Sequence, residues 1–119
     1  MPSVDIDINQ GLSELTKLPV YIGFLPNQGK LPLLVVQHSN VDDKRISNKT
    51  VTKKWTTNVI LFVQNPMDIF TYSEMIEKFF EGFAIKKYKS PVEYDGIYYQ
   101  EFRFEFVEKL TDNGYELYL

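Results

Sequence analysis

Residues 20–36 contain the pattern that most restricts how this chain can fold. They read Val-Tyr-Ile-Gly-Phe-Leu-Pro-Asn-Gln-Gly-Lys-Leu-Pro-Leu-Leu-Val-Val. Two short apolar segments, at about 20–25 and 31–38, are separated by a turn rich in proline, glycine and asparagine. Because proline lacks the N–H that a central strand donates, its positions here indicate strand starts and sheet edges. We expect two strands that form the first hairpin of a sheet and leave an edge open.

The segment before this hairpin combines two patterns. Residues 1–9 alternate apolar and acidic side chains from Val4 to Ile8, which is the period of a strand. At a terminus, this pattern fits either a flexible arm that adds to a neighbour's sheet or a plain N-terminal extension. Three leucines then recur at every third position along Gln10–Leu18. They predict a short helix that ends before Pro19.

A polar stretch, residues 39–54, separates the predicted hairpin from the next apolar run. Its ends extend the flanking strands, and its middle is either a loop or the tip of a long hairpin, with Asn48-Lys49 as a plausible turn. Residues 55–63 are rich in β-branched and aromatic side chains. Their last five positions are continuously apolar, which predicts a strand buried on both faces.

The second half of the chain has the clearest periodicities. Residues 71–83 begin with Thr-Tyr-Ser-Glu, the spacing of a capping box, and carry an apolar stripe at intervals of three and four, with Gly82 at the predicted end. Asp95-Gly96 predicts a hairpin between strands at 92–94 and 97–110, after a strand at 85–88. The alternation at 101–106 turns three phenylalanines toward the helix. After a turn at 111–114, the apolar tail 115–119 docks either on a partner or on the domain itself.

Composition limits the class of protein. The 119 residues fit a single domain spanning 1–119, and 44% hydrophobic residues suffice for one core. The net charge of -3 argues against nucleic-acid binding as the main task. With no cysteine, disulfides and thiolate metal sites are excluded. No signal segment or bilayer-length apolar run is seen, so a cytoplasmic or virion protein without membrane contact fits.

These patterns together predict an α+β fold. We expect a single antiparallel or mixed β-sheet, backed by one main amphipathic helix and a short N-terminal helix.

Residue types that carry reaction chemistry are sparse. His38 is the only histidine, and a metal site or catalytic dyad normally needs more than one well-placed group, so a structural or exposed role is favoured. Asp42 and Asp43 lie beside Lys44 and Arg45, which favours a solvated turn over a divalent-ion site. The glycines form no phosphate-binding loop. We expect no catalytic residues, no cofactor, no metal and no enzymatic activity.

The most distinctive polar feature is a basic cluster in the 39–54 stretch. It contacts DNA phosphates, meets an acidic partner surface, or keeps a long hairpin soluble; the residues alone leave all three open. Aromatic interleaving is poor there, and Trp55 fits a core or interface anchor better than a stacking platform. The cluster consists of Lys44, Arg45, Lys49, Lys53 and Lys54.

The order of the predicted elements resembles the small tail terminator proteins of long-tailed bacteriophages, which are also described as tail completion or head–tail joining proteins. In that family a Tyr-x-Gly-x-x-Pro-like segment follows the first helix, and here Tyr21 to Pro26 has that character. A strand led by proline comes next, here from Pro32. The amphipathic helix and closing β-block complete the resemblance, which covers about residues 10–107.

The resemblance implies a structural virion protein, assembled in the host cytoplasm, that forms a hexameric ring at the head-proximal end of the tail. Such a ring stops polymerisation of the tail tube, joins the head connector or stopper protein, and passes DNA without reading it. The implied contact residues are the basic cluster with Trp55, together with Tyr21, Pro26 and Pro32. A head-closure or minor capsid protein, or a nucleic-acid-binding regulatory module, are the alternatives.

Overall fold

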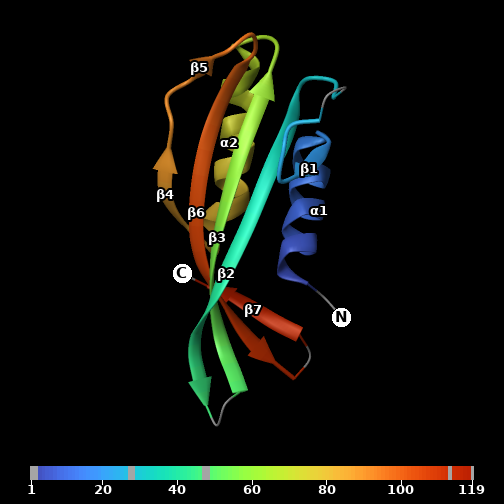
Figure 1. Ribbon diagram of the computed structural model, residues 1–119. Helices are drawn as coiled ribbons and strands as arrows, with labels where there is room; N and C mark the ends of the chain where they lie inside the picture. Colours follow the sequence, from blue (N-terminus) through green and yellow to red (C-terminus); the bar gives the residue numbers. More distant parts are fainter. Residues whose placement is uncertain (1–2, 27–28, 47–48, 113, 119) are drawn as a thin grey trace.

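The computed structural model describes residues 3–26, 29–46, 49–112 and 114–118. Seven strands form one mixed sheet, and two helices pack on one of its faces (Figure 1). The elements, in chain order, are α1 (Val4–Thr16), β1 (Val20–Ile22), β2 (Leu33–Ile46), β3 (Lys49–Val63), α2 (Asp68–Glu81), β4 (Ile85–Lys89), β5 (Glu93–Tyr94), β6 (Tyr98–Thr111) and β7 (Gly114–Tyr118). The predicted α+β class is confirmed. Both expected helices are present, but they have 13 and 14 residues, so the N-terminal helix is not the short one that was predicted.

The sheet is organised around the long strand β6. Its order is β1-β2-β3-β6-β4, with β5 and β7 also paired to β6. One side of β6 pairs with β3, and the other side pairs in turn with β5, β4 and β7. All these pairs are antiparallel; β1 and β2 are parallel. The strands β2, β3 and β6 therefore form the central part of the sheet, and β1 is an edge strand.

The apolar core lies between the helices and one face of this sheet. Phe102, Phe104 and Phe106 alternate along β6 and are buried on the helix side, which confirms the predicted stripe. The ring of Phe104 stacks on that of Phe80 from α2, with ring centroids 4.0 Å apart. Aromatic stacking between sheet and helix therefore holds the two layers together.

The N-terminal segment is a helix, so the predictions of a flexible arm at 1–9 and a helix starting at Gln10 are wrong for the described residues. Val4, Ile8 and Leu12 are buried at intervals of four, which is the helical period. Ile6, which suggested strand alternation, is 61% exposed. Asp5 and Asp7 lie in the first turn, where carboxylates favour a helix.

The predicted hairpin at 20–36 is also wrong. β1 has only three residues, and it runs parallel to β2, with Val20 opposite Leu34. The strand ends because Gly23 takes a φ of +89°, a conformation that favours glycine. The chain then loops back to the starting end before Pro32 leads into β2. The expectation that the prolines mark strand starts and an edge is confirmed, but the pairing is not that of a hairpin.

The main helix begins earlier than its sequence pattern indicates. α2 starts at Asp68, so Thr71 lies inside it and no capping box forms. The start is organised by Asn65, whose side-chain Oδ1 accepts a 3.0 Å hydrogen bond from the Met67 N–H. Its backbone carbonyl accepts another from Asp68. Gly82 is the C-cap, as predicted.

Two hairpins follow the predictions. The stretch 39–54 forms the long hairpin alternative, with β2 and β3 paired from Leu33 to Lys49; most of the predicted Asn48-Lys49 turn lies outside the described residues. Gly96 has a φ of +75° and joins β5 to β6. The apolar tail becomes β7, which pairs with β6 and docks on the domain itself, because the hydroxyl of Tyr115 donates a hydrogen bond to Asp7 of α1.

Candidate assembly surfaces

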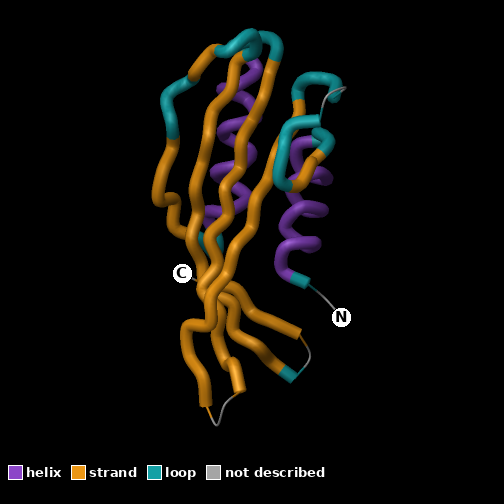
Figure 2. Tube along the Cα trace, viewed as in Figure 1, coloured by secondary structure: helices purple, strands orange, loops and turns teal. Residues whose placement is uncertain are grey.

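The hairpin of residues 39–54, which we call the arm, extends beyond the two helices. Figure 1 shows it at the lower end, beside the β6–β7 hairpin, with both helices confined to the upper part. Figure 2 shows that the described residues of this lower end are almost all strand. The molecule is accordingly elongated, with principal extents of 51 × 25 × 21 Å. Two exposed hairpins that extend beyond the helix-covered part of the sheet are typical of a segment that contacts another chain.

The structure brings the predicted basic cluster together along the arm. Lys44 and Arg45 lie on β2, and Lys53 and Lys54 lie on β3; the side chain of Lys49 is outside the described set. Lys54 pairs with Glu105 of β6 at 3.5 Å. Because both side chains of this pair are partly exposed, it adds little stability.

Lys44 has a distinct local setting. It lies between two shifts of the β2–β3 register, and its exposed side chain makes no ion pair with the described residues. A bulge re-aims the side chain that it carries. Lys44 is therefore a projecting cation on the arm.

Of the two roles expected for Trp55, core or interface anchor, the structure shows the core one. It is 7% exposed, and its ring lies parallel to that of Phe106, with centroids 6.3 Å apart. Its indole N–H donates a 2.8 Å hydrogen bond to the buried carboxylate of Glu108. This bond satisfies both polar groups where the arm leaves the core.

His38 has the structural role expected for it. Its Nδ1 lies 2.8 Å from the Thr57 hydroxyl and its Nε2 lies 2.7 Å from Asn9 Oδ1, so it connects the sheet to α1. Since Asn9 Oδ1 can only accept, Nε2 donates and Nδ1 accepts from the hydroxyl. Burial lowers the pKa of His38, and the charge of Asp5 offsets this only in part. The neutral ring therefore fits its partners.

The other three predicted contact residues lie around β1. Tyr21 is in this edge strand, and Pro26 and Pro32 lie in the loop that follows it; all three are half-buried. Pro26 lies close to Gly29 and Leu33, since a Cβ added at Gly29 would meet side-chain atoms of both.

The more exposed groups of this region were not singled out by the sequence. Ile22 and Phe24 are 65% and 76% exposed. Nearby, Leu25, Phe62 and Tyr99 line a cavity of about 260 Å³ on the outer face. The sequence feature that could have predicted this exposed apolar surface is the absence of any charged residue from Pro19 to Gly29, which is unusual for an exposed segment.

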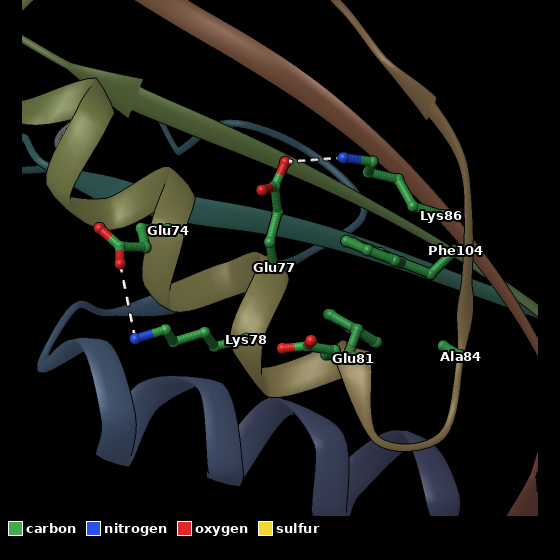
Figure 3. Close-up of a pocket in the computed structure, with 8 residues that line it drawn as sticks. Glu74, Glu77, Lys78, Glu81, Ala84, Lys86 and Phe104 are labelled. Carbon is green, nitrogen blue, oxygen red and sulfur yellow. Dashed lines mark hydrogen bonds and ion pairs between the residues drawn. The ribbon is translucent and has the colours of Figure 1, made fainter.

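A groove between α2 and β4 is the second surface that sequence reasoning missed. It has a volume of about 420 Å³, and Phe80 and Phe104 are among its lining residues. Figure 3 shows carboxylates of α2 on one side and Lys86 on the other. Glu74 pairs with Lys78 at 3.5 Å. Glu77 pairs with two lysines, Lys86 at 3.1 Å and Lys89 at 2.8 Å. The sequence feature that could have predicted this groove is the Glu and Lys pattern on the polar face of the helix, but the same pattern fits an ordinary solvated face.

The two carboxylates Glu77 and Glu74 of the groove differ in how firmly they are held. Partial burial acts to raise the pKa of Glu77, but hydrogen bonds from Lys89 and Lys86 and their charges outweigh it, so the pKa is lowered. Glu77 is therefore a charged, satisfied carboxylate. Glu74 is held only by an exposed pair, which it can exchange at small cost.

The chain has no detected resemblance to known protein families or curated proteins that would assign these surfaces a role. A scan against known protein families and a search of curated proteins found no match. Among the residues that the structure describes, no group of three or more His, Asp or Glu side chains could hold a metal ion. None of the described helices is long and apolar enough to cross a membrane.

Proposed function

We propose that this chain is a structural subunit of a bacteriophage virion. Copies of it assemble into a ring, a hexamer by the resemblance, at the head-proximal end of the tail, where the ring ends polymerisation of the tube and joins the head connector. The arm is the observation that carries this proposal. It continues the paired strands β2 and β3 of the core sheet past the helices. Such an element presents a surface to another chain without needing to fold on binding.

The edges of the sheet also support self-assembly. Among the described residues, no strand pairs with the outer side of β1, and its apolar neighbours are exposed, which are the features of an edge available for contact. A contact between two different surfaces of identical copies is heterologous, and it closes into a ring when the rotation between copies permits.

Mass photometry and negative-stain microscopy of the purified chain test this function. We expect ring-shaped oligomers, or a monomer that forms a ring when tail tubes are added. A stable monomer that also fails to bind tail tubes would contradict the proposal. A major tail protein encoded immediately downstream would add independent support.

A head-closure or minor capsid role uses the same kind of surface. Immunogold labelling of virions separates these roles, because a terminator lies at the head-proximal end of the tail and a capsid component lies within the head.

The basic arm favours one candidate of another class, a nucleic-acid-binding module. This candidate predicts DNA affinity that falls steeply with salt and is lost when Lys44 and Lys53 are both replaced by glutamate. Flat binding curves at low salt would remove it.

A further inference from the structure

The outer face of the sheet, which the two helices leave uncovered, has a cavity of about 260 Å³ with apolar walls. Ile60 and Phe62 of β3 alternate with buried residues and so face away from the helices. Tyr99 of β6 is paired with Phe62, and their ring centroids lie 5.9 Å apart. Leu25, from the loop after β1, completes the apolar wall. Pockets for small molecules usually have about 300–1,000 Å³, so this smaller cavity is better matched to one protein side chain.

Carboxylates form the charged part of this cavity. Asp95 and Glu101 line it, and no Lys, Arg or His is among the described residues that do so. Glu93 lies opposite Tyr99 in the β5–β6 pair. A hydrogen bond from the Tyr99 hydroxyl to Glu93, with the charges of all three carboxylates, raises the pKa of Tyr99. The rim of the cavity is therefore negative.

The three chain segments that build the cavity contain no cation. Residues 19–29, 56–76 and 91–101 have neither Lys nor Arg. Arg103, the first cation after them on β6, is already engaged, because its Nε donates a 3.1 Å hydrogen bond to Asn58 and its guanidinium lies over the Tyr88 ring. The occupant that matches this cavity therefore has an apolar side chain accompanied by cations.

The end of the arm has this chemistry. Ile46 is the last residue of β2, and its apolar side chain is 57% exposed. Lys44 precedes it with an exposed side chain, and the arm as a whole has five cations against Asp42 and Asp43. In Figure 1 the arm is at the lower end of the molecule, whereas β5 and the start of β6, beside the cavity, are at the upper end. The arm of one copy therefore cannot reach its own cavity.

We propose that the arm of one copy docks on the outer face of a second copy, with the Ile46 side chain in the cavity and the cations of the arm facing Asp95 and Glu101. The contact removes apolar area of both copies from water, and the opposite charges orient it. It joins two different surfaces of identical chains, so it is heterologous, as a ring requires. The inference rests on the proposed function, since it identifies the subunit contact of the ring.

Cysteine cross-linking tests the contact directly, because the natural chain has no cysteine. Chains carrying Ile46→Cys are mixed under mild oxidation with tagged chains carrying Leu25→Cys, an exposed position on the cavity wall. We expect a mixed disulfide dimer on a non-reducing gel. Mixing Ile46→Cys with Phe70→Cys, an exposed apolar position on α2, is the matched control and gives no such band. Absence of the mixed dimer at low salt and high protein concentration would overturn the contact.

Neutralising the acidic rim measures the electrostatic part of the contact by sedimentation velocity. Asp95→Asn combined with Glu101→Gln should weaken self-association at least about tenfold at low salt and remove most of its salt dependence. Asparagine suits the turn before Gly96 as well as aspartate does, so the fold is kept. Glu74→Gln combined with Glu81→Gln on α2 changes the net charge equally and is the control, which leaves association unchanged. Equal association of both double variants and the natural chain would contradict the proposal.

Ile46→Ser measures the apolar part of the contact. It should weaken self-association at least about tenfold without changing the circular dichroism spectrum, whereas Ile6→Ser, a similarly exposed position on α1, should leave association unchanged. A natural chain that stays monomeric at low salt and high concentration would refute the contact and leave the cavity to a basic segment of another protein. Rings that persist in Ile46→Ser would refute this contact and leave the ring standing. Open filaments that depend on Ile46 and never close would support the contact and refute the ring.

Discussion

The replacement of Gly11 by alanine tests the packing of α1 against α2. A Cβ at this position would lie 2.7 Å and 2.9 Å from two ring atoms of Phe79. That ring also packs edge-to-face against Phe80, at a centroid distance of 5.1 Å, and against Phe83 at 5.9 Å, so moving it away from a new Cβ would disturb these contacts. Alanine is favoured over glycine in a helix by about 1 kcal/mol. Overpacking costs about 1–3 kcal/mol, so we expect Gly11→Ala to destabilise the protein by up to about 2 kcal/mol.

The same replacement should change sign when the ring is absent. In a Phe79→Ala background the clash is gone, so Gly11→Ala should stabilise by about 1 kcal/mol. The coupling free energy between the two sites is then about 1–3 kcal/mol. Urea denaturation of the four chains at one temperature measures it, with a common m-value as the check on two-state behaviour.

A glycine at which an added Cβ would meet no other atom provides the control for this double-mutant cycle. A Cβ on Gly82 would meet nothing within 4 Å, and Gly82 caps α2 with an ordinary φ of -74°. Gly82→Ala should therefore not couple to Phe79. If the effects of Gly11→Ala and Phe79→Ala add within about 0.5 kcal/mol, the close approach of the helices is wrong.

Three further predictions concern the core and the polar contacts. Phe104→Ala should lower the free energy of unfolding by about 3–5 kcal/mol, whereas Phe24→Ala, at a 76% exposed position, should change it by less than about 0.5 kcal/mol in urea titrations. Trp55→Phe should cost about 1–3 kcal/mol because it leaves the buried carboxylate of Glu108 without its donor, and a measured change near zero would contradict that bond. Burial lowers the pKa of His38, so the unfolded chain binds its proton more readily, and stability should fall as pH drops through about 6.5; this slope should be absent in His38→Gln.

The N-terminal segment shows why part of the fold could not be predicted from local patterns. Residues Val4 to Ile8 satisfy both a period of two and a period of four, and the local sequence does not decide between them. Packing against α2 and the sheet decides it, because the helix buries Val4, Ile8 and Leu12 on one side. A glycine that weakens a helix locally then becomes useful, since Gly11 lets the Phe79 ring approach.

The candidate surfaces also differ in whether the sequence indicated them. The basic residues of the arm were visible as a charge run, and the long hairpin follows from the polar stretch between two strands. The cavity on the outer face was not visible, because its lining comes from β3, β6, the turn before β6 and the loop after β1. No local pattern shows that these distant segments meet.

The sequence by itself determined the periodic elements: the apolar stripe of α2, the alternating phenylalanines of β6 and the turn at Gly96. Each depends on side chains within a few residues, so local stereochemistry suffices. Only the tertiary structure decided that β1 runs parallel to β2 and that Trp55 is buried with Glu108. Those outcomes depend on contacts between distant segments, where the burial of apolar area and the pairing of polar groups across the whole fold outweigh local preference.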